Sequence, residues 1–385
     1  MKKIYYFDHA ASSWPKPPEV IEAMKQAVEE YGANPGRGSH YLAMKASRTL
    51  FQTRKRLAEL FRINNENDIS FCINTSYALN QAIQGYLREG DHVITTALEH
   101  NSVRRPLEYL KRKIGISVTY LPADERGQID LNELKAALTN KTRMLIVNHS
   151  SNLLGTILPI DKMSEIVKKK DVCVLVDAAQ TAGTYPIDVR QLGIDMLAFP
   201  GHKGLLGPQG TGGLYVRSGI ELEPLIHGGT GSRSEEVLQP DVLPDRFETG
   251  TQNTPGIAGL GAGVAKVLEE TPEKIHRREW ELTQMLMEGL LQIRGIQLLG
   301  PPLGEPRTGI VSFTLAGWDA SEVAYVLDRE YQIAVRAGHH CSPLAHQTAG
   351  TEKTGAVRAS VGFYTSEDEV RYFIDAVKAI ANRRP

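Results

Sequence analysis

Cysteine is scarce in this 385-residue sequence, which contains only Cys72, Cys173 and Cys341. An odd and sparse set of cysteines argues against the disulfide framework that small secreted proteins use. The apolar stretch at residues 4–7 ends too early to be part of a secretory signal, and no apolar run approaches membrane-spanning length. We therefore expect a cytoplasmic protein that does not bind a membrane.

An excess of charge of one sign is also absent. The 44 lysine and arginine residues nearly balance the 45 aspartate and glutamate residues, which gives a formal net charge of −1. No long run of one sign occurs, so neither nucleic acid nor an anionic membrane is expected as the main partner. Internal repeats and low-complexity segments are missing as well. What remains is the composition of a globular enzyme that is long enough for two domains.

The most informative stretch is the glycine-rich loop around Lys203. Apolar residues 195–199 predict a strand before it, and residues 214–216 predict a second strand after it. Upstream, residues 172–176 form the continuous apolar run that is typical of a buried parallel strand, and Asp177 follows at the end where such sheets bind ligands. A lysine and a carboxylate that face one ligand suit pyridoxal phosphate, since the amine forms a Schiff base and the carboxylate keeps the ring nitrogen protonated.

Three motifs, in a fixed order, resemble one enzyme family. The segments Val176-Asp-Ala-Ala-Gln180 and Gly201-His-Lys203 resemble the cofactor site of class V aminotransferases, which are fold-type I pyridoxal-phosphate enzymes. The segment Val335-Arg-Ala-Gly-His-His-Cys-Ser-Pro343 resembles the active-cysteine segment of the group II cysteine desulfurases, the branch that also contains the selenocysteine lyases. The resemblance extends from about residue 5 to about residue 375.

The resemblance implies an α/β architecture with two domains. A large cofactor-binding domain, residues 16–260, is expected to contain a mostly parallel sheet flanked by helices. Residues 1–15 and 261–385 are expected to form a smaller α+β domain that carries the active-cysteine loop. Local patterns agree with this division. They predict helices at residues 18–31, 43–61, 77–86, 263–268, 273–293, 320–330 and 366–383, and strands at 69–73, 92–96, 143–147 and 310–314.

The junction between a predicted strand and a predicted helix contains Thr75 and Ser76. Hydroxyls and free backbone N–H groups at a helix N-terminus bind phosphate well. Taken alone, such a motif is more often only a helix cap. The family resemblance assigns the cofactor phosphate to Thr75 and Ser76, with His202 as a further contact. It also places Thr251 at the phosphate of the neighbouring subunit, which implies a homodimer with shared active sites.

Further positions match residues that surround the cofactor ring in the family. His100 matches the histidine that stacks on the pyridine ring and is a candidate proton shuttle, although a loop histidine by itself is more often an ordinary hydrogen-bonded residue. Asn152 and Gln180 match residues beside the phenolic oxygen of the ring, and Asn152 is also a candidate substrate contact. The sequence departs from the family at Pro200, where many relatives have Ser or Thr as a phosphate ligand. Since proline offers neither a hydroxyl nor a backbone N–H, we expect one phosphate donor to be missing.

Cys341 decides between the functions that this scaffold supports. Neighbouring basic residues such as Arg336 would favour its thiolate, and glycine and proline leave its loop open. One alternative is a zinc site that joins Cys341 to His339, His340 and His346, but this spacing matches no common structural zinc pattern and we expect no metal. The other alternative is a structural cysteine. That reading suits the other two cysteines better, because both lie in apolar strand runs.

A short strand pattern at residues 356–361 carries Arg358, and a guanidinium fixed in this way is a natural clamp for an amino-acid carboxylate. The position matches the carboxylate-binding arginine of the family, while Arg336 is the second candidate and is better suited to line the approach to the active cysteine. The predicted reaction converts L-cysteine to L-alanine, with Lys203 taking the Cα proton and Cys341 taking the sulfur as a persulfide. A sulfur-acceptor protein is a candidate partner, and iron–sulfur cluster assembly is a candidate use of the sulfur.

Three other functions fit parts of the same pattern. A selenocysteine lyase would use the same scaffold on L-selenocysteine. A class V aminotransferase, lyase or epimerase that acts on another amino acid would need Lys203 and Asp177 but not Cys341. A cofactor-binding scaffold within a sulfur-transfer complex would show no turnover at all.

Overall fold

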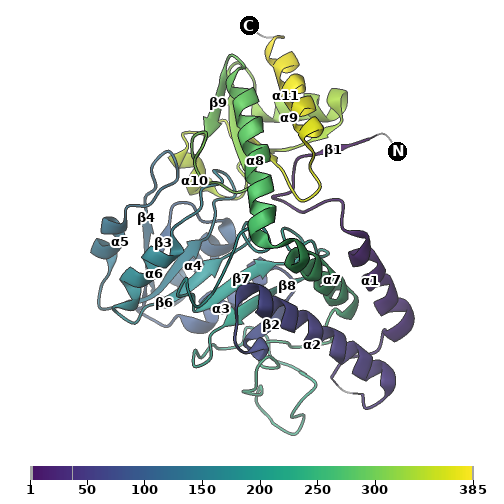
Figure 1. Cartoon of the computed structure of the whole chain (residues 1–385). Helices are drawn as coiled ribbons and strands as arrows, with labels where there is room; N and C mark the ends of the chain where they lie inside the picture. The colour runs from purple at the N-terminus through teal and green to yellow at the C-terminus, as the bar shows by residue number, and fades with distance from the viewer. Residues whose placement is uncertain (1–2, 37, 384–385) are drawn as a thin grey trace.

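The computed structural model describes residues 3–36 and 38–383. Figure 1 shows a lower part built around a large sheet and an upper part built around a small one, with the long helix α8 (Pro272–Leu291) running from one to the other. Within the described residues, none of the helices combines the length and the apolar character that spanning a membrane requires.

The large sheet has seven strands in the order β2, β8, β7, β6, β5, β3, β4. Their bounds are Ile69–Cys72 (β2), His92–Thr96 (β3), Ser117–Leu121 (β4), Thr142–Asn148 (β5), Cys173–Asp177 (β6), Met196–Pro200 (β7) and Gly212–Val216 (β8). From β4 through β3, β5 and β6 to β7, neighbouring strands are parallel, whereas β8 is antiparallel to both β2 and β7. The mostly parallel sheet that the sequence predicts is confirmed.

Helices cover both faces of the large sheet. Their bounds are Pro18–Tyr31 (α1), Tyr41–Phe61 (α2), Thr75–Tyr86 (α3), Asn101–Ile114 (α4), Leu131–Ala137 (α5), Ile160–Lys168 (α6) and Thr254–Glu270 (α7), with a single 3-10 turn at Glu66–Asp68. Val174 and Val176 of β6 share one apolar core with residues of α2, α6 and α7. Cys173 and Leu175 of the same strand share another core with α3 and α4. A strand buried on both faces explains why its sequence is a continuous apolar run.

The small sheet has four antiparallel strands in the order β12, β13, β10, β9. These elements and their helices are Ile296–Leu299 (β9), Ile310–Leu315 (β10), Ala320–Tyr331 (α9), Arg336–Gly338 (β12), Pro343–Thr348 (α10), Ala356–Ser360 (β13) and Glu367–Ala381 (α11). Near the N-terminus, β1 (Tyr5–Tyr6) pairs in parallel with β11 (Ile333–Ala334) in a separate two-stranded sheet, and Asp8 forms a bridge to Ser360 of β13. The predicted domain boundary near residue 260 falls inside α7, and the division into domains stays a prediction.

Two helices near the site begin earlier than the sequence pattern predicts. The predicted start of α3 is residue 77, but the helix begins at Thr75 because the Asn74 side chain caps it and accepts a hydrogen bond from the N–H of Tyr77 at 2.9 Å. The helix α7 similarly begins at Thr254 after a cap by Asn253. The apolar period does not extend into these first turns, which is why the pattern missed them.

Two side chains, one on β10 and one in the segment just before it, hold the loop that follows β5. Arg307 is fully buried and donates hydrogen bonds to the carbonyls of Leu154 (3.0 Å), Pro301 (2.9 Å) and Ile310 (3.0 Å). The Ser312 hydroxyl donates to the carbonyl of Leu153 at 2.5 Å. The clamp therefore fixes the large sheet and the small sheet relative to each other.

Replacing Arg307 with methionine removes every donor of this side chain while nearly keeping its length. We expect the free energy of unfolding to fall by at least about 3 kcal/mol, because several buried carbonyls lose a partner at about 1–3 kcal/mol each. Urea unfolding measures the change. The matched control is Arg329→Met on α9, where the side chain is 69% exposed and the unfolding free energy should stay nearly unchanged. Equal effects of the two substitutions would contradict the clamp.

Candidate active site

A cavity of about 220 Å³ opens at the carboxyl ends of the parallel strands. Asn148 and Asp177, the last residues of β5 and β6, are register partners and border it. Lys203, three residues after the end of β7, borders it from the next loop. The cavity is also lined by Ala10, Ala11, Thr75, Ser76, His100, Asn152, Gln180, His202, Arg336 and Arg358. It thus brings together the predicted site residues apart from Cys341 and Thr251.

Lys203 and Asp177 are both enclosed by protein. Burial lowers the pKa of Lys203 to about 8, and the positive charge of Arg358 acts in the same direction. Burial raises the pKa of Asp177, although the N–H of Ala179, 2.9 Å from Oδ1, and the charge of Lys203 oppose the shift. A charge on either side chain is therefore costly here. A cationic ring nitrogen beside Asp177 would offset this cost for the carboxylate.

Several buried polar atoms at the cavity lack a hydrogen-bond partner within the described chain, namely Asn148 Oδ1, Asn152 Oδ1, His202 Nδ1 and Arg358 Nε. Folded proteins leave few such atoms, so this group indicates a polar ligand. Thr75 and Ser76 form the first turn of α3, whose leading N–H groups have no helical partners and suit a phosphate. With an amine at Lys203 for an aldehyde and a carboxylate at Asp177 for a ring nitrogen, the set fits pyridoxal phosphate.

His100 forms part of the cavity wall in a fixed orientation. Its Nδ1 accepts a hydrogen bond from the N–H of Ser102 at 3.0 Å, which caps α4. Burial, aided by the charge of Lys203, lowers the pKa of His100 to about 4, so the ring is neutral near pH 7. A neutral and fixed imidazole on the wall suits stacking on a planar ligand.

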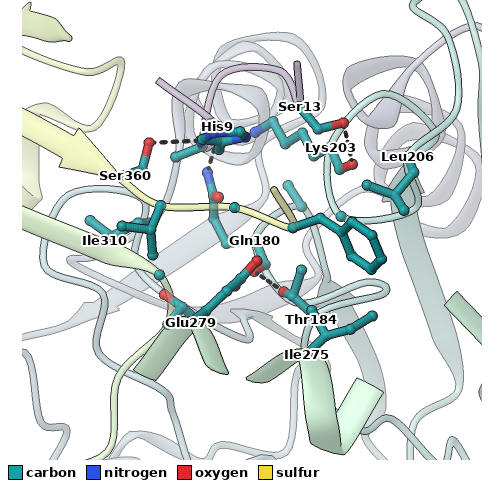
Figure 2. Close-up of a pocket in the computed structure, with 18 residues that line it drawn as sticks. His9, Ser13, Gln180, Thr184, Lys203, Leu206, Ile275, Glu279, Ile310 and Ser360 are labelled. Atoms are coloured by element: carbon teal, nitrogen blue, oxygen red, sulfur yellow. Dashed lines mark hydrogen bonds between the residues drawn. The ribbon is translucent and has the colours of Figure 1, made fainter. Parts of the chain in front are cut away.

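A second cavity of about 40 Å³ also borders Lys203 (Figure 2). It shares Ala10 and Gln180 with the first cavity and reaches Glu279 on α8. At its edge, the Ser13 hydroxyl donates to the backbone carbonyl of Lys203 at 2.9 Å. The N-terminal segment therefore holds the lysine loop in place.

Cys341 lies at the rim and not within the larger cavity. It is exposed and borders a neighbouring open groove together with Ser76 and His100, which line both spaces. Arg336 connects the two spaces, because it lines the cavity while its Nη2 lies 3.6 Å from the Cys341 Sγ. By contrast, Cys72 and Cys173 are buried, and burial raises the pKa of both thiols.

The backbone at Cys341 adopts an unusual conformation. His340 and Cys341 have φ values of 48° and 59°, a region that residues with a Cβ rarely occupy. Two hydrogen bonds hold it there. The amide of Asn152 donates to the carbonyl of His340 at 2.6 Å, and the N–H of Asn101 donates to the carbonyl of Cys341 at 2.8 Å. The thiol is thus presented by a segment that both sheets fix.

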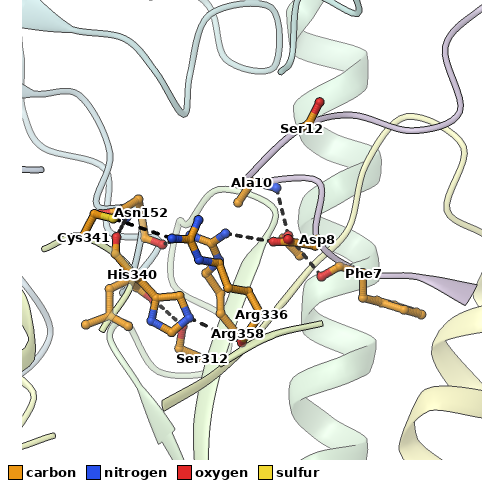
Figure 3. A network of polar contacts seen from close by, with 12 residues as sticks. Phe7, Asp8, Ala10, Ser12, Asn152, Ser312, Arg336, His340, Cys341 and Arg358 are labelled. Carbon is orange, nitrogen blue, oxygen red and sulfur yellow. Dashed lines mark hydrogen bonds and ion pairs between the residues drawn. The ribbon is translucent and has the colours of Figure 1, made fainter. Parts of the chain in front are cut away.

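Arg358 lies on β13 between two partners, as Figure 3 shows. Its Nη2 pairs with Oδ1 of Asp8 at 3.0 Å, and its Nη1 donates to the carbonyl of Asn152 at 2.9 Å. The guanidinium is almost fully buried, so it is held rigidly at the cavity wall. Its Nε has no hydrogen-bond partner within the described chain, and a ligand carboxylate at this wall would compete with Asp8 for Nη2.

The histidines near Cys341 take part in hydrogen bonds within the protein. The rings of His340 and His346 stack with centroids 5.5 Å apart, and the Thr351 hydroxyl lies 2.8 Å from Nδ1 of His346. His339 Nε2 lies 2.7 Å from the carbonyl of Glu352. Throughout residues 3–36 and 38–383, no cluster of histidine, cysteine or carboxylate side chains could hold a metal ion.

Comparison with known proteins decides the family. The family model described as aminotransferase class-V matches residues 5–373. This chain belongs to the class V aminotransferases. It is 37% identical over 382 residues to a probable cysteine desulfurase of Methanothermobacter thermautotrophicus, covering 98% of this chain and 94% of that protein. It is 30% identical over 396 residues to the cysteine desulfurase IscS of Dictyoglomus turgidum, covering 100% and 96%.

Solved structures give the same result. An apo structure of a cysteine desulfurase from Thermococcus onnurineus is similar with a TM-score of 0.93 and 34% identity, covering 99% of this chain and 95% of that one. The cysteine desulfurase CsdA from Escherichia coli has a TM-score of 0.90 and 26% identity, with the same coverage. The motifs thus predicted the class V family correctly. They also correctly predicted the fold and the similarity to cysteine desulfurases. Assignment to group II stays a prediction.

Besides Cys341, two positions of this class V chain that the sequence analysis singled out lie outside the cavity. Thr251 borders a different space, next to Gly229 and Glu248, so it does not meet Lys203 within one chain. Its expected place at the neighbouring subunit's phosphate stays a prediction. Pro200 is buried at the end of β7 and does not line the cavity.

Two residues of the site were not identified from the sequence. Asn148 offered a visible signal, because it is a polar residue at the end of an apolar strand, as Asp177 is. Asp8 offered no local signal, since its partner Arg358 is 350 positions away in the chain. Only the packing of the N-terminal segment against β13 brings this pair together.

Replacing Lys203 with methionine should stabilise the cofactor-free protein at pH 7 by about 2–3 kcal/mol, because the buried ammonium group is removed. The pKa of lysine is 10.5 in the unfolded chain, but folded Lys203 loses its proton near pH 8. The free energy of unfolding of the wild type therefore rises as the pH increases from 8 to 10.5. The advantage of the variant should therefore shrink from pH 8 to pH 10.5. Urea unfolding at pH 7 and pH 10 measures this, with exposed Lys169→Met as the control. A gain that persists at pH 10 would contradict the assignment.

Proposed function

We propose that this class V chain is a pyridoxal-phosphate-dependent cysteine desulfurase that converts L-cysteine to L-alanine and keeps the sulfur as a persulfide on Cys341. One observation supports this most directly. An exposed thiol lies 3.6 Å from Arg336, at the rim of a cavity that contains a half-buried lysine, a buried aspartate and a buried arginine. A transaminase needs the last three groups but has no use for the thiol.

The lining of the cavity and the family resemblance together support the following cofactor contacts. Lys203 would hold the cofactor aldehyde, and Asp177 would pair with the ring nitrogen. Thr75, Ser76 and His202 would bind the phosphate, with Thr251 of the second subunit in a homodimer as a further contact. His100 would stack on the ring, while Asn152 and Gln180 would contact its phenolic oxygen. When bound, pyridoxal phosphate withdraws electrons from the Cα of the substrate.

The chain's own residues perform the remaining steps. Arg358 holds the substrate carboxylate through the free Nε and through Nη2 in competition with Asp8. Lys203 accepts the Cα proton, and its lowered pKa favours the neutral amine that this step needs. Arg336 stabilises negative charge on the sulfur of Cys341, which attacks the substrate sulfur. An S–S bond forms, the Cβ–S bond breaks, and Cβ gains a proton to give alanine.

The position of Cys341 suits sulfur transfer out of the site. Because the thiol is exposed at an open groove, a persulfide there can be reached by a second thiol from solution. We propose a cytoplasmic homodimer that passes sulfur to an acceptor protein, with assembly of iron–sulfur clusters as the use of the sulfur. The same residues would act on L-selenocysteine.

The Cys341→Ser variant tests this function. With L-cysteine and a reductant, wild type should release sulfide and alanine in equal amounts, and the variant should release neither, at least about a hundredfold less, while still binding the cofactor by absorbance. Cys173→Ser is the matched control, since this thiol is buried at the start of β6, and it should retain activity. Equal turnover by wild type and Cys341→Ser, or a ketone product, would favour an aminotransferase or lyase acting on another amino acid.

The Pro200→Ser variant tests the missing phosphate donor. It should bind pyridoxal phosphate as tightly as wild type or up to about tenfold more tightly, because the new hydroxyl adds at most one hydrogen bond to a charged group. Titration of the cofactor-free protein, followed by absorbance, gives the dissociation constant. A clear loss of affinity would show that serine at this position supplies no donor.

A further inference from the structure

The smaller cavity beside Lys203 has three ionisable side chains on its wall. They are Glu279 on α8, His9 in the N-terminal segment and Lys203 itself. Figure 2 shows Glu279 on the side of the cavity away from His9 and Lys203, with Gln180 between them. Apart from Gln180 and a few small polar residues, the wall is mainly apolar, with Ile275 and Ile310 among its members. A polar side-chain atom that faces this mainly apolar wall finds few hydrogen-bond partners in the protein.

The Glu279 carboxyl group has no hydrogen bond or ion pair with any residue that the structure describes, although Glu279 is only 6% exposed. Burial raises its pKa to about 8, so it is a neutral carboxylic acid near pH 7. Burying an unpaired carboxyl group costs free energy even in the neutral form, and proteins usually reduce this cost with ordered water. The geometry therefore indicates a ligand for this group.

His9 faces the same space with the same deficiency. It is 9% exposed, and its Nδ1 has no partner in the described chain, while its Nε2 lies 3.4 Å from the Thr365 hydroxyl. Burial lowers its pKa to about 4, so the ring is neutral. A cavity of about 40 Å³ holds about three water molecules at roughly 10–15 Å³ each. Water thus fits both the space and its unpaired polar groups.

We propose that this cavity holds a short chain of water molecules that links Glu279 and His9 to Lys203, and that Glu279 stores a proton for Lys203 during the reaction. This proposal rests on the proposed function. Glu279 does not touch the substrate, so it is a positioning residue for the proton and acts through Lys203.

The proton balance of the reaction explains why a store is useful. Conversion of cysteine to alanine with sulfur passing to Cys341 loses one S–H bond in total and gains one Cβ–H bond, while the Cα–H bond is broken and formed again. Lys203 alone can hold one proton at a time. A second proton must therefore come from elsewhere. Glu279 is a carboxylic acid at rest, so it can pass its proton through the water to Lys203 after Lys203 has given up the first one, and it can then regain the proton that a thiol releases. Such transfers are easiest between groups of similar pKa.

Two other ionisable side chains of α8 have partners outside this cavity. Arg278 on the same helix donates to the carbonyl of Thr365 at 3.2 Å, and the His276 ring packs edge-on against Tyr185 with centroids 4.8 Å apart. The strands β10 and β13 contribute Ile310 and Ser360 to the cavity and no ionisable side chain. Lys203 and His9 are thus the titratable groups on the described cavity wall that face Glu279.

The first test uses the cofactor-free protein and does not depend on activity. Infrared difference spectra between wild type and Glu279→Gln should show the carbonyl band of one protonated carboxylic acid at pH 7, and the band should disappear with a midpoint near pH 8. The control is Glu281→Gln, the same change at an exposed position two residues along α8, which should not alter the band. A spectrum without this band would overturn the proposal.

The second test measures proton transfer in the loaded enzyme without sulfur chemistry. Wild type should exchange the Cα hydrogen of L-alanine with deuterium from the solvent, and Glu279→Gln should slow this exchange at least about tenfold. Glu279→Asp, which keeps the acid, should recover part of the rate, and Glu281→Gln should match wild type. If Glu279→Gln exchanges as fast as wild type, or if the Gln and Asp variants are equally slow, a purely structural role replaces the proton store.

The two tests also separate this proposal from the proposed function. Failure to form alanine from cysteine in wild type would overturn the desulfurase assignment, while the infrared band and alanine exchange would still report on Glu279. Normal desulfuration by wild type without the infrared band would overturn the proton store alone.

Discussion

The hydrogen bonds that clamp the loop after β5 hold the two halves of the active site together. The backbone carbonyls of residues 152–154 accept hydrogen bonds from Arg358, Ser312 and Arg307. Arg358 and Ser312 lie on strands of the small sheet, and Arg307 lies in the segment just before β10. All three donors are buried, so loss of any one leaves a carbonyl without a replacement from solvent. The distance from Lys203, in the loop after β7 of the large sheet, to Arg358 and Cys341 on the side of the small sheet depends on this contact.

Burial determines the protonation of the ionisable side chains around the two cavities. The same low-polarity surroundings lower the pKa of Lys203 and raise the pKa values of Asp177 and Glu279, because each charged form loses water. The charged states must then be stabilised by partners that arrive with ligands. The site is therefore unfavourable as an empty space and favourable once a polar cofactor and substrate fill it, which is typical of functional sites.

The three cysteines show how position decides reactivity. Cys72 and Cys173 lie in strands of the large sheet, where burial disfavours the thiolate. Cys341 lies in a left-handed segment that two hydrogen bonds hold open to solvent beside Arg336. Cys341 is therefore open to solvent at the rim, while Lys203 lines the cavity itself.

Local sequence determined much of this protein. The continuous apolar run of residues 172–176 determined a strand buried on both faces, and its end placed Asp177 at the edge where parallel sheets bind ligands. Tertiary structure alone decided that Asp8 pairs with Arg358 and that Glu279 faces the cavity behind Lys203. Periodicity reports which face of an element is buried, because that depends on neighbours three or four residues away. It cannot report which distant side chains share that interior, because that depends on how the two sheets pack.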